Sequence, residues 1–231
     1  VPGVREVGPG EPLLSSGVLA AGLLMASGDK DAKRRLLPGI AAGTTIATVT
    51  MTGESGTWTP AGVAVSARSA NGRTTLDGAA SYVTHGQIAD VIFVVAKAED
   101  GLGLFEVAAD ATGLTRRALP SFDRTLRLAR LDFMDTPARQ IGRMGWPAVQ
   151  SALDLALVAL AGEQAGGARR IFDMTVDYAR TRIQFGRPIG GFQAIKHMAA
   201  DLLIEVESAT SAARHAAEEL GANRVLQLDT F

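Results

Sequence analysis

The sequence predicts an α+β fold in which a helical segment, a β-domain and two long helices follow one another. Three observations predict it. Apolar residues have helical spacing as far as about residue 40, short strand-like runs separated by turn signals fill residues 43–138, and helical periodicity returns after Gly145-Trp146-Pro147. With 231 residues, the chain can bury a substantial core in one large domain or two small ones.

The first element is a helical segment over residues 12–39. Gly28-Asp29 predicts a break within it, and Pro38-Gly39 predicts its end. The run from Leu13 to Ala26 is its most apolar part, but about 14 residues are more typical of a core helix than of a membrane span. The residues spaced for one buried face are Leu13, Leu14, Val18, Leu23, Leu24, Leu36 and Leu37.

The middle of the chain reads as a series of short strands. Asn71-Gly72, in ANGRTTLDG, is the strongest short hairpin signal in the sequence. Asp100-Gly101 joins two strands in DVIFVVAKAEDGLGLFEVAAD. Further strand-like runs are TTIATVTM, GVAVSARS and RLARLDFM. This many short strands with turn signals between them predicts a compact antiparallel barrel or sandwich.

Two long helices are expected to complete the chain, beginning near Pro147, which suits a first helical turn. Gly186 and Pro188 predict the end of the first helix, Gly190-Gly191 the corner, and Gly221 the end of the second. One face of the first helix carries Phe172, Val176, Ala179 and Ile183. One face of the second carries Ile195, Met198, Leu202, Val206, Ala209 and Ala213.

Composition narrows the class of protein. The formal net charge of -1 gives no electrostatic footprint for nucleic acid or an anionic membrane. The sequence contains no cysteine, which removes disulfides, thiolate metal sites and a cysteine nucleophile and fits a reducing compartment. Glu6 and Glu11, rather than a basic region, precede the apolar run at Leu13. A cytoplasmic protein is therefore expected.

Single-sequence signatures of enzymes are not found. The three histidines, His85, His197 and His215, are scattered, so no metal site is expected. Ser55 lies in GESGT, which lacks the glycine spacing of a nucleophile elbow. GLGLFE lacks the third glycine of a dinucleotide fingerprint, and no phosphate-binding GxxxxGK[ST] motif occurs.

Two groups of residues remain as candidate sites. TVTMTGESGTW, from Thr48 to Trp58, is a strand that ends in small and hydroxyl-bearing residues. It is either a polar turn or a lining for a ligand carbonyl or ring edge. At the helical corner, Arg182 and Arg187 flank a helix end beside Phe185, and Gln193 opens the next helix. Arg182 either complements the helix dipole or binds a phosphate, and spacing does not separate the two.

The corner also carries a family resemblance. DYARTRIQFGRPIGGFQAIKHMAADLLIEVESA resembles the first two helices of the C-terminal domain of acyl-CoA dehydrogenases, with Leu202 where Met is usual. ATVTMTGESGTW is similar to that family's T-E-P-x-x-G-S-D loop, and TTLDGAASYVTHGQIADVIFVVA to a strand pair of its β-domain. The resemblance covers about residues 11–217. The matched corner residues are Tyr178, Arg182, Phe185, Gly186, Ile189, Gln193, Ala200 and Asp201.

The resemblance implies an acyl-CoA dehydrogenase-like fold with FAD as cofactor. Residues 1–40 would be the end of a largely missing N-terminal helical domain, 41–142 the β-domain, and 143–231 the first half of a helical bundle. The implied reaction, typical of fatty acid β-oxidation, is dehydrogenation of an acyl-CoA thioester at Cα–Cβ to the trans-2-enoyl-CoA. Electrons would pass to an electron-transferring flavoprotein.

The resemblance also assigns site residues by position. Thr52, Gly56 and Thr57 would line the flavin and thioester end of the pocket, and Tyr82 and Thr84 would contact the isoalloxazine ring. On the helical corner, Arg182 would meet the FAD pyrophosphate of a neighbouring subunit. Phe185 and Gln193 would lie against its nucleotide half. A homotetramer, or a heterotetramer with a related subunit, is therefore expected.

Departures from the family pattern leave the catalytic base unassigned. By the resemblance, the bundle half that normally carries a catalytic glutamate would lie outside this sequence, and Ala156 and Leu157 would occupy the alternative glutamate position and its neighbour. The nearest carboxylates on that helix, Asp154 and Glu163, are expected to be structural or solvated. Gly53-Glu54 and His85 also replace the usual Glu-Pro and Asn.

Three hypotheses follow from these residues. The first is an FAD-dependent acyl-CoA dehydrogenase. The second is a non-catalytic or half-site subunit of a heteromeric acyl-CoA dehydrogenase, which would complete the FAD site of a partner. The third is an α+β binding module without redox chemistry.

Overall fold

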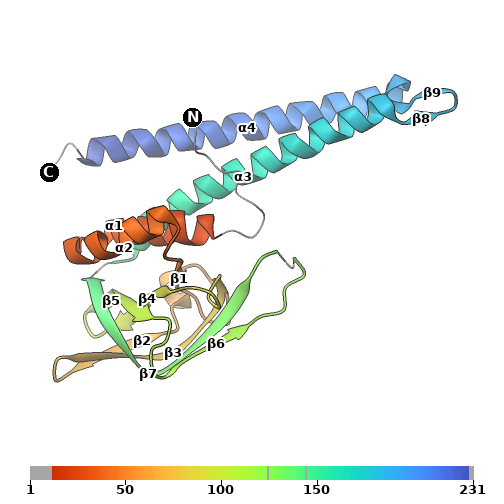
Figure 1. Cartoon of the computed structure of the whole chain (residues 1–231). Helices are drawn as coiled ribbons and strands as arrows, with labels where there is room; N and C mark the ends of the chain where they lie inside the picture. Colours follow the sequence, from red (N-terminus) through yellow and green to blue (C-terminus); the bar gives the residue numbers. More distant parts are fainter. Residues whose placement is uncertain (1–11, 124, 144, 229–231) are drawn as a thin grey trace. The chain divides into compact units, whose positions relative to one another are not determined.

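The computed structural model describes residues 12–123, 125–143 and 145–228 (Figure 1). Contacts divide the chain into two compact units, Val1–Ala156 and Leu157–Phe231. The described residues do not include residues 1–11 of the expected 1–40 segment, among them Glu6 and Glu11. They also do not include the last three residues of the expected 143–231 segment. No helix among the described residues is both long enough and apolar enough to cross a membrane.

The N-terminal helical segment breaks where the sequence predicts and ends later than predicted. A π-helix η1 (Leu13–Ala20) continues into α1 (Ala21–Ala26), and α2 (Lys30–Ala42) follows a break at Gly28, whose φ is 76°. Asp29 caps α2 by accepting a hydrogen bond from the Ala32 amide at 2.9 Å.

The predicted end of this segment at Pro38-Gly39 is wrong. Pro38 lies inside α2, which ends at Gly43 in a left-handed conformation with φ 71°. The amides of Gly43 and Thr44 donate to the carbonyls of Ile40 and Gly39, at 3.1 and 3.0 Å. Because a glycine can close the helix in this way, α2 ends at Ala42 with Gly43 as its cap, and Pro38 is accommodated within the helix with the loss of an internal hydrogen bond.

The β-domain is a closed barrel with two strands attached. The ring runs β4–β2–β3–β7–β5 and closes through the pairing of β4 with β5; β1 pairs with β4, and β6 pairs with β7. A 3₁₀ turn η2 (Pro60–Gly62) precedes β2. The strands are β1 (Ala47–Thr50), β2 (Ser66–Ala70), β3 (Arg73–Thr84), β4 (Val91–Ala98), β5 (Gly101–Ala108), β6 (Leu114–Ala118) and β7 (Leu128–Arg143).

Of the predicted alternatives, barrel or sandwich, the structure has the barrel, but the expectation of an antiparallel sheet is only partly right. β1 and β2 run parallel to β4, whereas the other pairings are antiparallel. The Asn71-Gly72 hairpin is confirmed: both residues have positive φ, as a type I′ turn requires, and Ala70 pairs with Arg73. β4 and β5 meet at the predicted turn, where Ala98 pairs with Gly101. β6 was not predicted.

The core lies on both faces of β4. Phe93 and its alternate neighbours pack with Leu23, Leu24 and Val49 in one cluster, which includes the helices. Ile92 and its alternate neighbours pack with Phe105 in the second cluster, made by the strands. A strand buried on both faces carries apolar residues at successive positions, which explains the run VIFVV.

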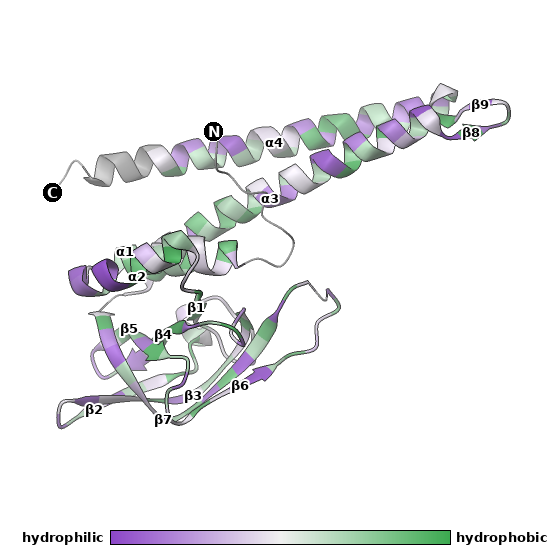
Figure 2. Cartoon of the chain, in the orientation of Figure 1, coloured by the Kyte–Doolittle hydropathy of each residue, from purple (hydrophilic) through white to green (hydrophobic). Residues whose placement is uncertain are grey.

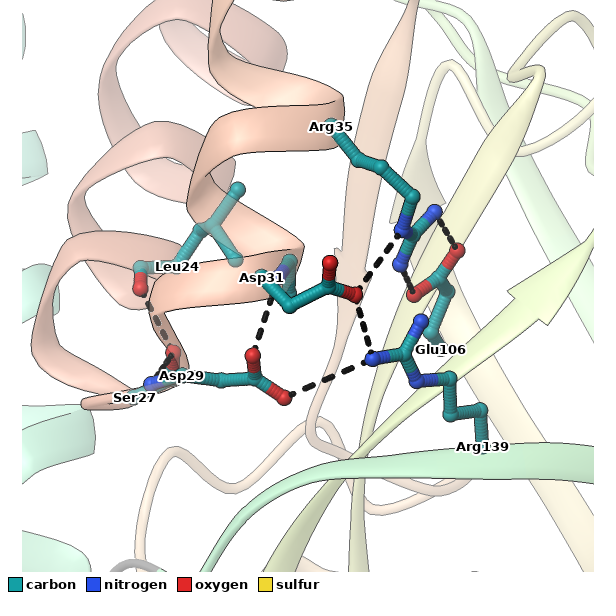
Figure 3. Close-up of polar contacts among 8 residues, drawn as sticks. Leu24, Ser27, Asp29, Asp31, Arg35, Glu106 and Arg139 are labelled. Atoms are coloured by element: carbon teal, nitrogen blue, oxygen red, sulfur yellow. Dashed lines mark hydrogen bonds and ion pairs between the residues drawn. The ribbon is translucent and has the colours of Figure 1, made fainter.

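Ion pairs hold α2 against the barrel (Figure 3). Arg35 donates two hydrogen bonds to Glu106 of β5, at 3.0 and 2.6 Å, and Arg139 of β7 donates one to Asp31 at 2.7 Å. The bond from Arg139 is the main cause of the lowered pKa of Asp31. These side chains are accessible to solvent, so the network orients α2 more than it stabilises the fold.

The second unit is a helical hairpin. α3 (Trp146–Thr181), which begins in the first unit, is followed by β8 (Ile183–Gln184), β9 (Arg187–Pro188), the 3₁₀ turn η3 (Ile189–Gly191) and α4 (Gln193–Leu228). Both predicted helices are confirmed. The predicted end near Gly221 is wrong, because α4 continues to Leu228; one glycine costs only about 1 kcal/mol in a helix.

Apolar side chains from the two helices meet in a groove. It has a volume of about 300 Å³. The predicted faces contribute Phe172, Val176, Ala179, Ile195, Met198 and Leu202 to its lining. Ile183 is an exception, because it lies in β8 and is 53% exposed. Figure 2 shows hydrophobic and hydrophilic residues interleaved along α3 and α4.

Candidate functional site

A β-bulge places Tyr82 at the surface of the barrel. Between the pairs Ala80–Leu131 and Val83–Ala129, β3 advances three residues and β7 only two. Tyr82, in the extra stretch, has φ 59°, a left-handed conformation that is rare for a bulky residue. Its side chain remains 51% exposed. Strained backbone held in this way is typical of functional sites.

The bulge contacts the loop from Thr52 to Thr57. The Ser81 amide donates to the Thr52 carbonyl at 3.0 Å, and the Tyr82 hydroxyl donates to the Glu54 carbonyl at 3.3 Å. A Cβ added to Gly56 would lie 3.4 Å from the Tyr82 ring. The structure therefore brings together Thr52, Gly56 and Tyr82, which the sequence separates by up to 30 positions.

The conformation of this loop is fixed by its own backbone. The Gly53 amide donates to the Gly62 carbonyl at 3.0 Å, and the Gly56 amide donates to the Gly53 carbonyl at 3.2 Å. A Cβ on Gly62 would lie only 1.9 Å from the Thr57 carbonyl oxygen, so the chain passes too close for any side chain there. Thr57 itself is exposed.

Thr84 lies at the end of β3, two residues beyond Tyr82. Its carbonyl accepts a hydrogen bond from the Thr48 hydroxyl of β1 at 2.6 Å. The predicted residues Thr52 and Thr84 are therefore positioned by β1 and β3, but within the described part of the chain no hydrogen bond joins them directly.

An ion pair beside the loop was not predicted from the sequence. Glu54 pairs with Arg130 of β7, which also donates to Asp132 at 2.8 Å. The hydrogen bonds to Asp132 and then Glu54 raise the pKa of Arg130. Because Glu54 and Arg130 are 76 positions apart, no local pattern could have found the pair.

The predicted helical corner in the second unit is a short β-hairpin. α3 ends at Thr181. The Arg182 amide donates a hydrogen bond to the Tyr178 carbonyl, and the Arg182 carbonyl accepts one from the Ile189 amide, each at 2.8 Å. Phe185 and Gly186 form the turn between β8 and β9, with φ values of 52° and 76°. These values fit a type I′ turn, although Phe is unusual in a left-handed conformation.

The side chains of this corner are largely open to solvent. Phe185 is 92% exposed and meets Phe192 edge to face at 6.1 Å. The Arg187 guanidinium lies 4.1 Å from the centre of the Phe192 ring. The Nε2 atom of Gln193 lies 3.4 Å from the Nε2 atom of His197. The Arg182 side chain has no ion pair or hydrogen bond within the part of the chain that the structure describes.

The residues at the expected position of a catalytic base carry no carboxylate. Ala156 is buried and Leu157 is 51% exposed. Asp154 is exposed and accepts a hydrogen bond from Gln150 at 2.9 Å, and Glu163 is exposed. Among the described residues, no group of three or more potential metal ligands exists.

A closed β-barrel with a bulged tyrosine, followed by a long helical hairpin, defines a two-unit α+β protein. Residues 143–228 match the family described as acyl-CoA dehydrogenase, C-terminal domain. Acyl-CoA dehydrogenase IpdE2 of Mycobacterium tuberculosis is 35% identical over 182 residues, covering 76% of this chain and 50% of that protein.

Solved structures agree with this match. Glutaryl-CoA dehydrogenase from Mycobacterium smegmatis, in complex with FADH2, is 25% identical with a TM-score of 0.83, covering 87% of this chain and 54% of that one. The ChsE4–ChsE5 complex from Mycobacterium tuberculosis is 32% identical with a TM-score of 0.76, covering 90% and 57%. This chain belongs to the acyl-CoA dehydrogenase family. It spans about half the length of the relatives it matches.

Proposed function

We propose that this chain is the flavin-binding portion of an FAD-dependent acyl-CoA dehydrogenase. The enzyme would convert an acyl-CoA thioester to the trans-2-enoyl-CoA and pass the electrons to an electron-transferring flavoprotein. The observation that carries the proposal is the assembly of the Thr52–Thr57 loop with the Tyr82 bulge, in a chain of this family. A cytoplasmic location is part of the proposal and rests on the absence of cysteine.

The residues of the barrel site fit a flavin. Tyr82 offers a half-exposed aromatic ring beside Gly56, where the missing side chain leaves the ring edge open. Thr57 and Thr84 add hydroxyl groups that suit the polar edge of an isoalloxazine ring or a thioester carbonyl. Thr52 is buried, and its hydroxyl donates to the Gly53 carbonyl at 3.4 Å. FAD, when bound, would accept the hydride from Cβ of the substrate. The residues named here would orient the two reactants and exclude water.

The corner of the second unit fits the phosphates of FAD. Arg182 carries a guanidinium without a partner in the described residues, and such a group pairs strongly with a pyrophosphate. We propose that Arg182 meets the FAD of a neighbouring subunit, with Phe185 and Gln193 against the nucleotide half. The assembly would then be a homotetramer or a heterotetramer with a related subunit.

A half-site subunit is the second candidate function. It is favoured by Ala156 and Leu157, neither of which can accept the α-proton. Glu54, the carboxylate nearest the barrel site in sequence, is engaged by Arg130. The similarity to the ChsE4–ChsE5 complex gives this candidate a heteromeric relative. In this case the chain would complete the FAD site of a partner that supplies the base.

The visible absorption spectrum of the purified intact protein is the first test. Oxidised flavin bands that bleach on adding an acyl-CoA, with the polypeptide alone, would support the first candidate and exclude the half-site subunit. Flavin that appears only with a related partner chain would support the second. A protein that binds no flavin under either condition would overturn both and leave a binding module without redox chemistry.

A further inference from the structure

His85 is a buried residue that the proposed function does not use. It follows Thr84 directly and lies three residues beyond Tyr82. Only 4% of it is exposed, and its φ of 59° is left-handed. A histidine in this conformation, at the end of the strand that carries the candidate flavin contacts, calls for a physical reason.

A buried hydrogen bond joins His85 to the π-helix η1. Ser15 Oγ lies 2.9 Å from His85 Nδ1, and only 4% of Ser15 is exposed. The Ser15 hydroxyl also contacts the Pro12 carbonyl at 3.3 Å. Since one hydroxyl proton cannot serve both contacts, both are satisfied when His85 Nδ1–H donates to Ser15 Oγ and Ser15 donates to Pro12.

The π-helix connects two strands of the candidate site. Two consecutive serines of η1 are buried, and Ser16 Oγ accepts a hydrogen bond from the Ala47 amide at 2.9 Å, where β1 begins. Ser15 reaches the end of β3 through His85. π-Helical turns are rare and often occur at functional sites. Here the π-helix η1 contacts β1 through Ser16 and the end of β3 through Ser15.

The backbone between Tyr82 and His85 is held at both ends. At one end the Ser81 amide donates to the Thr52 carbonyl at 3.0 Å. At the other, the His85 amide donates to the Arg127 carbonyl at 2.7 Å, and the imidazole bonds to Ser15. Two left-handed residues within four positions are strained, so this stretch keeps its shape only where surrounding contacts determine it.

We propose that His85 is a positioning residue: its hydrogen bond to Ser15 fixes the Tyr82–Thr84 backbone in the conformation that receives the flavin ring. This inference rests on the proposed FAD site and adds to it the buried contact between Ser15 and His85. The ligand is the isoalloxazine ring, and Ser15 and His85 act on it only through Tyr82 and Thr84.

The test compares Ser15→Ala, His85→Gly and the double variant in the intact protein. His85→Gly is suitable because glycine adopts the left-handed conformation without strain and the substitution removes the imidazole. Ser66→Ala is the matched control, since Ser66 makes an exposed hydroxyl bond to the Asp77 carbonyl of the same barrel. The measurements are the FAD dissociation constant, the position of the bound flavin's visible bands, and unfolding of the FAD-free protein.

Ser15→Ala is expected to weaken FAD binding by about three- to tenfold, as the loss of one buried hydrogen bond predicts, and His85→Gly by at least as much. The flavin bands should shift, the double variant should be no weaker than His85→Gly, and Ser66→Ala should match the natural protein. Unchanged affinity and spectrum in Ser15→Ala would overturn the inference. Loss of the FAD-free fold would also overturn it, because the role would then be structural. A natural protein that binds no FAD would instead refute the proposed function.

Discussion

The barrel loop and the helix α3 differ in how closely the rest of the chain surrounds them. In the barrel, a Cβ added to Gly53 or Gly62 would meet neighbouring atoms at 2.6 or 1.9 Å. In α3, a Cβ on Gly162 or Gly166 would meet nothing within 4 Å. The barrel loop is therefore shaped by its own contacts, whereas the second unit offers surface and charge that its own described residues do not use.

The largest expected effect comes from adding one methyl group to the barrel loop. Gly62→Ala forces a Cβ against the Thr57 carbonyl and should lower the free energy of unfolding by about 3 kcal/mol. Gly162→Ala, in open helical space, should raise it by up to about 1 kcal/mol. Denaturant unfolding measures both. Equal effects at the two glycines would remove the contrast between the units.

The next largest effect concerns the two arginines near the end of α3. Arg182→Ala should cost about 1.5–3 kcal/mol of FAD affinity, because it removes a charge-assisted bond to the pyrophosphate. Arg180→Ala is the matched control, since Arg180 already pairs with Asp177 at 3.5 Å. FAD titration of both variants measures the difference. If Arg182→Ala binds FAD like the control, the arginine only complements the helix dipole.

A smaller effect is expected at the turn between β8 and β9. Phe185→Asn replaces a strained left-handed phenylalanine with the residue preferred in a type I′ turn. Relief of about 1–2 kcal/mol of strain should outweigh loss of an exposed aromatic contact of about 0.5 kcal/mol. The FAD-free protein should therefore become more stable while FAD affinity falls. Lower stability in urea would show that Phe185 is held by packing.

The smallest effect is expected in the ion pairs between α2 and the barrel. The pKa of Asp31 is lowered from 3.8, mainly by the hydrogen bond from Arg139. Its contribution to stability is therefore present above pH 3.8 and is lost as the pH falls through the lower folded value.

Asp31→Asn should consequently lower the melting temperature slightly at neutral pH and lose less stability than the natural protein on acidification. High salt should shrink the difference, because the pair is exposed. Melting curves over pH and salt test this. A difference that persists unchanged in strong acid would exclude Asp31 ionisation as its cause.

Local sequence patterns predicted most of the secondary structure. Asn71-Gly72 determined a hairpin because few residue pairs accept two positive φ angles. The spacing of Phe172, Val176 and Ala179 determined a helix face because the helical period places them together. The same reasoning failed at Pro38 and Gly221. Both residues lie inside helices, α2 and α4, although each type of residue is unfavourable in a helix interior.

The candidate site was predicted only in part. The family resemblance selected Thr52, Gly56 and Tyr82, and the structure brings these three together. It gave no indication of the Glu54–Arg130 ion pair or of the Ser15–His85 bond. It also implied a helical corner without the hairpin that exposes Phe185.

By itself, the sequence determined the resemblance to the family, most of the helices and strands, and several of the turns. These depend on residues a few positions apart, whose backbone preferences and apolar period are local. Closure of the barrel, the bulge at Tyr82 and the link from Ser15 to His85 were decided by the tertiary structure. They join residues up to 70 positions apart. Local preferences do not select among the many possible distant partners, so these contacts form only when the whole core packs.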